Sequence, residues 1–243
     1  MAVAPRVGFW HCWPSNRGDT MATIALKAAD GHEFSAYEAS PAGTPLGGLV
    51  IVQEIFGVTA HIRGVADGFA ADGYRAIAPA LFDRAEPGVD LDYGPAGVER
   101  GRALRQMVET GDMLRDIAAT ADALKGAGKV AVVGYCLGGS LAWLTATGLD
   151  GFAAAVGYYG GTIAAHAGET PRCPVLLHFG ETDAGIPMSD VEKVKAATDP
   201  AMVEVFTYPA GHAFNRDGGA SYSAHSAMLA RMRTVRFLQK HVG

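Results

Sequence analysis

The sequence predicts an α/β fold with a mostly parallel central sheet, helices on both faces of that sheet and an antiparallel hairpin at its N-terminal side. From residue 49 onward, short continuous apolar runs alternate with segments whose apolar residues recur three and four positions apart. Such runs are typical of strands buried on both faces, and the longer spacing is typical of helices packed on a sheet. Before them, residues 22–28 and 33–39 alternate apolar and polar side chains around a Gly-His turn, which predicts the hairpin.

The remaining elements follow from the same two patterns. Runs rich in Val, Ile and Tyr predict strands at residues 49–53, 74–78, 130–135, 153–159, 175–179 and 203–208. Helical spacing predicts helices around residues 62–69, within residues 104–124 and over residues 222–241. In the last helix, Met228, Met232, Val235 and Leu238 share one side, which predicts that this side packs into the core.

The length predicts one large domain. A chain of 243 residues, 49% of them hydrophobic and 19% charged, can bury a substantial core, and no repeat or low-complexity linker divides it. The first strand pattern begins only after Met21. We therefore expect residues 1–20 to be an N-terminal extension and residues 21–243 to be a single domain.

Composition argues against several functional classes. The 20 basic and 25 acidic residues are scattered along the chain and leave a net charge of −5, so no electrostatic footprint for nucleic acid is present. No apolar run approaches the roughly 20 residues that span a bilayer. Cys12, Cys136 and Cys173 show neither paired nor zinc-ligand spacing, and no glycine-rich phosphate loop is present. We expect a cytoplasmic monomer or small homo-oligomer that needs no metal or other cofactor.

Cys136 lies in the sequence Gly134-Tyr135-Cys136-Leu137-Gly138, between a predicted buried strand and the start of a helix. The pattern G-x-C-x-G is that of a nucleophile elbow with sulfur in place of oxygen. The two glycines let neighbouring segments pass close to a sharply turned backbone. A helix N-terminus favours the thiolate, and the Leu137 backbone N–H lies where an oxyanion would form. The structural alternative is a small buried hydrophobic residue in a common glycine-rich turn.

Asp183 and His212 each follow a predicted strand, and both strands lie after the elbow in the chain. Because parallel strands end at the same edge of a sheet, both side chains should approach Cys136 there. The order nucleophile, acid, histidine is that of α/β-hydrolases. The histidine would take the thiol proton, and the aspartate would orient the ring and offset its charge. Asp183 could instead be an ordinary helix-cap or turn aspartate.

With these residues the sequence resembles the dienelactone hydrolase family, which consists of small α/β-hydrolases with a cysteine nucleophile. The resemblance spans residues 24–238 and is carried by four ordered blocks. These are Gln53-Glu54-Ile55-Phe56-Gly57, Gly134-Tyr135-Cys136-Leu137-Gly138-Gly139, Gly157-Tyr158-Tyr159-Gly160 and Ala210-Gly211-His212-Ala213-Phe214.

The resemblance implies roles for further residues. It implies that Cys136, Asp183 and His212 are the triad, and that Glu54 accepts the thiol proton once a substrate carboxylate draws away the arginine that holds it. The matching arginine is Arg216, and a second substrate-binding arginine matches Arg84. The Ile55 and Leu137 backbone N–H groups would form the oxyanion hole. Without the resemblance, both arginines would be interpreted as solvated surface residues.

The resemblance implies hydrolysis of a small anionic lactone or ester, namely the opening of dienelactone (4-carboxymethylenebut-2-en-4-olide) to maleylacetate. One departure concerns the substrate, because Ala213 stands where members acting on dienelactone often carry a serine. Residues 85–100 match the family poorly and are expected to form part of the pocket wall. Two alternatives stay open: a cysteine-dependent esterase or lactonase acting on another small ester, and a catalytically silent binding protein of the same fold.

Overall fold

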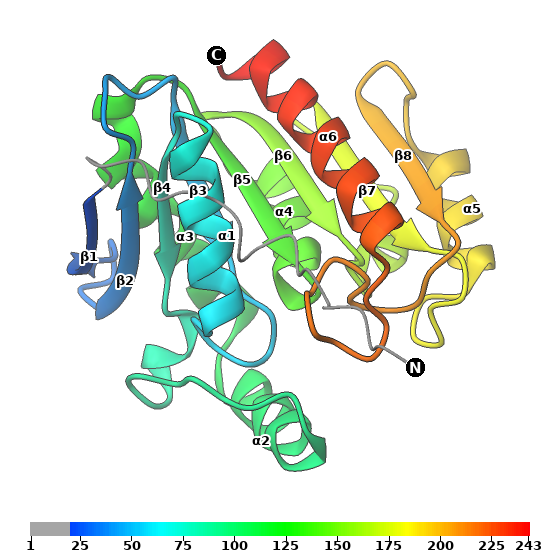
Figure 1. Ribbon diagram of the computed structural model, residues 1–243, viewed down its shortest axis with the longest axis horizontal. Helices are drawn as coiled ribbons and strands as arrows, with labels where there is room; N and C mark the ends of the chain where they lie inside the picture. Colours follow the sequence, from blue (N-terminus) through cyan, green and yellow to red (C-terminus); the bar gives the residue numbers. More distant parts are fainter. Residues whose placement is uncertain (1–19) are drawn as a thin grey trace, which may run out of the picture.

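The computed structural model describes residues 20–243, and its eight strands form one twisted sheet (Figure 1). The strands are β1 (Thr20–Lys27), β2 (Glu33–Ser40), β3 (Gly48–Val52), β4 (Arg75–Pro79), β5 (Val130–Tyr135), β6 (Phe152–Tyr158), β7 (Val175–Gly180) and β8 (Val203–Tyr208). Every predicted strand is present, with its ends within two residues of the predicted ones. The expected extension over residues 1–20 lies outside the described residues except for Thr20, so the division of the chain stays a prediction.

The strand order is β1-β2-β4-β3-β5-β6-β7-β8. The hairpin β1–β2 is antiparallel and joins β4 in antiparallel register, whereas all other neighbours pair in parallel. All residues of β3 and β5 are buried, as expected for central strands covered on both faces. The predicted α/β class, with its mostly parallel sheet and N-terminal hairpin, is therefore confirmed.

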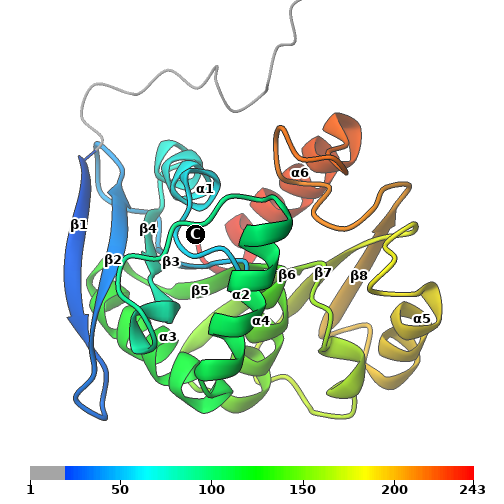
Figure 2. The same ribbon diagram turned by 90° about the horizontal axis from the view of Figure 1, so that it is seen from below.

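Six α-helices accompany the sheet in the described part of the chain: α1 (Ala60–Ala71), α2 (Pro95–Met107), α3 (Thr110–Leu124), α4 (Leu137–Gly148), α5 (Met188–Ala197) and α6 (Ala224–His241). Helices α1 and α6 cover one face, and α3, α4 and α5 cover the other (Figure 2). The pattern over residues 104–124 belongs to two helices, because Val108 leaves helical geometry. Helix α5 gave no clear signal in the sequence, since Val191 and Val194 are its only buried residues. None of the helices in residues 20–243 combines the length and apolar character needed to cross a membrane.

The predicted inner face of α6 is confirmed at Leu238 and wrong at Met228 and Met232. Met228 and Met232 are 45% and 43% exposed, while the buried positions are Ser226, Ala227, Ala230, Thr234, Phe237 and Leu238. Small residues let the helix lie close to the sheet, and the Thr234 hydroxyl pairs at 2.7 Å with that of Tyr158. The buried side of α6 thus includes a polar contact, and hydrophobic periodicity does not register such contacts.

Helix α2 stands apart from both layers and lies across the edge of the sheet where the parallel strands end (Figures 1 and 2). It contacts this edge through Gly101, where a Cβ atom would lie only 2.2 Å from the backbone oxygen of Ile55. Ile55 follows β3, so a glycine without a side chain is what lets the helix backbone touch this loop. Helix α2 is therefore held directly over the loops at the carboxyl ends of the strands.

Candidate active site

Cys136 occupies a sharp turn between β5 and α4. Its backbone has φ 55° and ψ −110°, a strained conformation for a residue other than glycine, and its amide donates to the Tyr158 carbonyl at 3.0 Å. Gly138 is required next to it because a Cβ atom there would lie 2.2 Å from the Val52 carbonyl oxygen. The Gly138 amide instead donates to the Gln53 carbonyl at 3.0 Å. The turn thus presents the thiol beside the loop after β3.

Asp183 and His212 meet Cys136 at this edge. The Nε2 atom of His212 lies 3.2 Å from Sγ of Cys136, and Nδ1 lies 2.7 Å from Oδ2 of Asp183. The other oxygen of Asp183 accepts from the Gly185 amide at 2.8 Å. The carboxylate is 0% exposed and its position is held by these bonds. The three side chains form the continuous chain of contacts that a nucleophile, a base and an orienting acid need.

His212 favours its charged form in this setting. Burial works to lower its pKa, but the hydrogen bonds with Asp183 and Cys136 outweigh burial and raise the pKa to about 10. An imidazolium between a buried carboxylate and a thiol stabilises negative charge on sulfur. The arrangement can therefore hold a proton on the ring while the sulfur acts as a nucleophile.

We predict that Asp183→Asn flattens the dependence of stability on pH. A raised folded pKa contributes stability that is complete below the unfolded histidine value of about 6.5. This contribution is lost as the pH rises through the folded value of about 10. Melting temperatures between these two pH values should therefore decline more steeply in the wild type than in the variant. Parallel profiles would show that Asp183 does not hold the proton on His212.

The residues around these three candidate residues also have strained backbone conformations. Besides Cys136, the described residues other than glycine with positive φ are Tyr159 (φ 40°) and Ala213 (φ 59°). Tyr159 packs on the His212 ring with centroids 5.1 Å apart, and Ala213 directly follows His212. Both residues are buried, so their conformations are held by the surrounding packing. Strain gathered at one place in a fold is typical of a functional site.

A cavity of about 510 Å³ opens beside the three candidate residues. Cys136 and His212 line it together with Ile55 and Leu137, whose backbone N–H groups are the predicted oxyanion donors. The other lining residues come from the α2–α3 junction, α4 and the loops after β6 and β7. They are Arg105, Thr110, Leu114, Ser140, Leu141, Leu144, Gly161, Thr162, His166, Gly185 and Ile186. Residues 85–100, the expected wall, do not line it.

Glu54 lies two residues after β3, does not line this cavity, and is 1% exposed. Its Oε2 atom is 3.6 Å from Nη1 of Arg216, longer than a strong charge-assisted hydrogen bond. The guanidinium of Arg216 also stacks on Tyr93, 3.9 Å from the ring centroid. Burial raises the pKa of Glu54 more than the charges of Arg216 and His212 lower it. A carboxylate held this way binds a proton readily.

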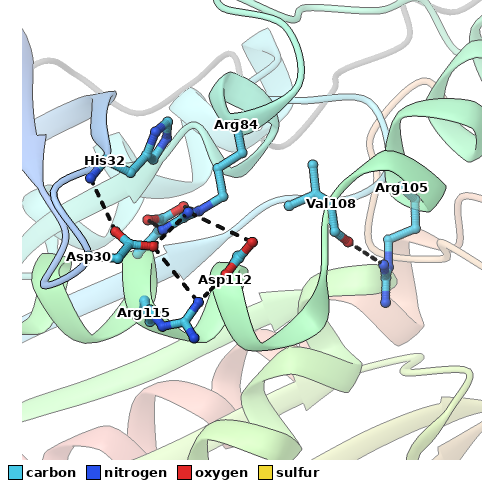
Figure 3. Close-up of polar contacts among 8 residues, drawn as sticks. Asp30, His32, Arg84, Arg105, Val108, Asp112 and Arg115 are labelled. Carbon is cyan, nitrogen blue, oxygen red and sulfur yellow. Dashed lines mark hydrogen bonds and ion pairs between the residues drawn. The ribbon is translucent and has the colours of Figure 1, made fainter.

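Arg84 is not brought to the cavity. It ends a short 3₁₀ helix (Leu81–Arg84), and its guanidinium binds both oxygens of Asp116, at 2.8 and 2.7 Å, and Asp30 at 2.9 Å. Figure 3 shows it directed toward Asp30 and Asp112, while Arg105 extends toward Val108 on the other side of the view. Three carboxylates from the hairpin turn and α3 attract Arg84 away from the substrate position that the resemblance implies.

The sequence did not single out Arg105, which lines the cavity from α2. It is one of several arginines in residues 100–115, and helical spacing does not tell which of them faces the strand ends. Within residues 20–243, no group of three or more His, Cys, Asp or Glu side chains is arranged to hold a metal ion.

Comparisons with known proteins place these features in a family. The model of the Dienelactone hydrolase family matches residues 34–242. The carboxymethylenebutenolidase of Pseudomonas putida is 34% identical over 88% of this chain and 94% of its own length. Among solved structures, the "Putative Dienelactone Hydrolase" of Klebsiella pneumoniae is 31% identical, with a TM-score of 0.79 over 90% of this chain and 97% of that one. An esterase of Pyrococcus furiosus, 15% identical with a TM-score of 0.67 over 98% and 99% of the two chains, shares the fold.

Proposed function

This chain belongs to the dienelactone hydrolase family and is a carboxylic ester hydrolase, and on that premise we propose that it opens dienelactone to maleylacetate with Cys136 as the nucleophile. The observation that carries the proposal is the contact chain from Sγ of Cys136 through His212 to Asp183 at the wall of a cavity. A small-molecule lactone or ester fits the size and the largely apolar lining of this cavity.

The proposed reaction has two halves. In the first, the Cys136 thiol gives its proton to the Glu54 carboxylate and the sulfur attacks the lactone carbonyl carbon, while the Ile55 and Leu137 N–H groups bind the developing oxyanion. The ring C–O bond then breaks, the leaving enol oxygen takes a proton from His212, and a thioester remains. In the second half, His212 removes a proton from water, which attacks the thioester. The C–S bond breaks, the carboxylic acid product leaves, and the sulfur takes back the proton held by Glu54, which restores the thiol.

Glu54 and Arg216 are proposed to control the first proton transfer. Glu54 is nearly fully buried, its pKa is raised by that burial, and its ion pair with Arg216 is long. An anion that attracts Arg216 would leave Glu54 as the stronger base, so the thiolate would form when substrate is bound.

A cysteine-dependent esterase acting on another small ester is the second candidate. It is favoured by Ala213, which offers no hydroxyl to a substrate, and by Arg84, whose guanidinium is taken up by carboxylates of the protein. Both candidates use the same triad, so they differ in substrate and not in mechanism.

We expect the purified protein to consume cis- or trans-dienelactone, followed as the decay of its ultraviolet absorbance, and to lose this activity on selective alkylation of Cys136. A simple activated ester is tested in the same way as a second substrate. Decay of dienelactone that depends on Cys136 would support the proposal. Cleavage of the activated ester but not of dienelactone would favour the second candidate, the esterase. Turnover of either substrate by fully alkylated protein would contradict the cysteine mechanism.

A further inference from the structure

The cavity contains an arginine that no carboxylate of the described residues neutralises. Arg105 binds the Val108 carbonyl at 2.8 Å and the Thr110 hydroxyl at 2.7 Å, and both of these acceptors are uncharged. Arg84 and Arg216, by contrast, pair with Asp116 and Glu54. Of these three arginines, Arg105 alone lines the cavity. Its positive charge is therefore free to act on whatever occupies that space.

We propose that Arg105 binds an anionic group of the substrate, a carboxylate separate from the ester or lactone that Cys136 cleaves. This inference rests on the proposed function and names the recognition device of the same site. It assigns the selectivity for acidic substrates to the α2–α3 junction instead of to Arg84.

The other lining residues support an anionic ligand. No Asp or Glu lines the cavity, whereas Arg105, His166 and His212 all do. The two histidines already have carboxylate partners, because His212 binds Asp183 and His166 binds Glu169, each at 2.7 Å. Among the cationic side chains that line the cavity, Arg105 is thus the one without a carboxylate partner in the described residues. A bound anion would supply that partner. Much of the remaining wall is leucine and isoleucine, which strengthens the attraction between opposite charges by lowering the local dielectric constant.

Arg105 lies on the face of α2 that packs on the loop after β3. Gly101 is the residue at which α2 touches the Ile55 carbonyl, and Arg105 follows four positions later, on the same face of the helix. Ile55 is also the residue whose N–H is the proposed oxyanion donor. The face of α2 that packs on the oxyanion loop therefore also presents the guanidinium to the substrate.

The two existing hydrogen bonds prepare the guanidinium for binding. They tie Arg105 to the start of α3 and so restrict the side chain before a ligand arrives, which reduces the entropy lost on binding. They use two of the five N–H groups of the side chain. The remaining groups can donate to a carboxylate, for which the planar fork of arginine is suited.

The test compares two activated esters of nearly equal size, the anionic mono(para-nitrophenyl) glutarate and the neutral para-nitrophenyl valerate. In Arg105→Gln we expect the ratio of kcat/KM for the anionic to the neutral ester to fall about 30-fold, mainly through KM, as the loss of a charged hydrogen-bonding partner implies. Arg105→Lys should recover part of this ratio. Arg102→Gln is the matched control, because Arg102 lies on the same helix but is exposed and does not line the cavity.

An unchanged ratio in Arg105→Gln, with turnover still dependent on Cys136, would overturn this inference and leave the proposed function standing. Equal losses on both esters would also overturn it, because they would indicate that Arg105 only ties α2 to α3. If neither ester were cleaved through Cys136, calorimetric titration with glutarate would decide the inference, while the dienelactone assay would decide the proposed function separately. Tighter glutarate binding by the wild type than by Arg105→Gln would support it, and equal binding would refute it.

Discussion

Cys136→Ala is expected to lower kcat/KM for the hydrolysed ester by at least about 10⁴-fold while the protein stays folded, because loss of a nucleophile removes the covalent route entirely. Alanine adopts the strained φ of 55° at about the same cost as cysteine, so the turn should persist. The substitution removes the hydrogen bond to His212 and the packing of a partly buried sulfur, and we expect the free energy of unfolding to change by about 1 kcal/mol. Kinetics and thermal melting on the same preparation measure both effects.

Cys173→Ala is the matched control for this prediction. Cys173 is 4% exposed and lies outside the cavity, and burial raises its pKa to about 11, so it has little thiolate at neutral pH. This variant should keep its activity. Residual activity of Cys136→Ala near that of the wild type, or loss of activity in Cys173→Ala, would contradict the assignment of Cys136. A large fall in the melting temperature of Cys136→Ala would instead support a packing role for its side chain.

Arg84→Ala is expected to destabilise the fold by about 3–5 kcal/mol, the usual cost of removing one partner of a buried ion pair. Asp116 is 0% exposed and receives two hydrogen bonds from Arg84. Burial already raises the pKa of Asp116, and without the guanidinium the carboxylate would have to stay buried and unpaired or take up a proton. For a chain of this size the loss corresponds to a melting temperature lower by about 10 °C.

Arg115→Ala serves as the control because it removes a neighbouring arginine whose side chain is 51% exposed and pairs with Asp112. Exposed ion pairs contribute little, so this variant should lose no more than about 1 kcal/mol. Arg84→Ala should also keep the preference for anionic over neutral esters. A normal melting temperature together with loss of that preference would return Arg84 to the substrate-binding role that the resemblance implies.

The placement of the strands and of the triad candidates could be predicted because each depends on local patterns. Strands 130–135 and 203–208 were predicted with the ends that the structure shows, since their apolar residues stop at glycine or proline turns. Cys136 follows the first of these strands directly, His212 lies in the loop after the second, and parallel strands deliver such residues to one edge. Two different contacts, 3.2 and 2.7 Å long, then join three residues that are far apart in the chain.

The sequence by itself therefore determined the α/β class, the strands and the residues at their carboxyl ends, because periodicity and turn chemistry act over a few residues. Only the tertiary structure decided which arginine meets the cavity and which side of α6 is buried. Arg84 is drawn away by Asp30 and Asp116, which are 54 and 32 residues distant in the chain, and Arg105 is positioned by the contact of Gly101 with Ile55. Such contacts depend on how distant segments pack. The sequence around an arginine looks the same whether the side chain contacts water, a carboxylate of the protein or a substrate.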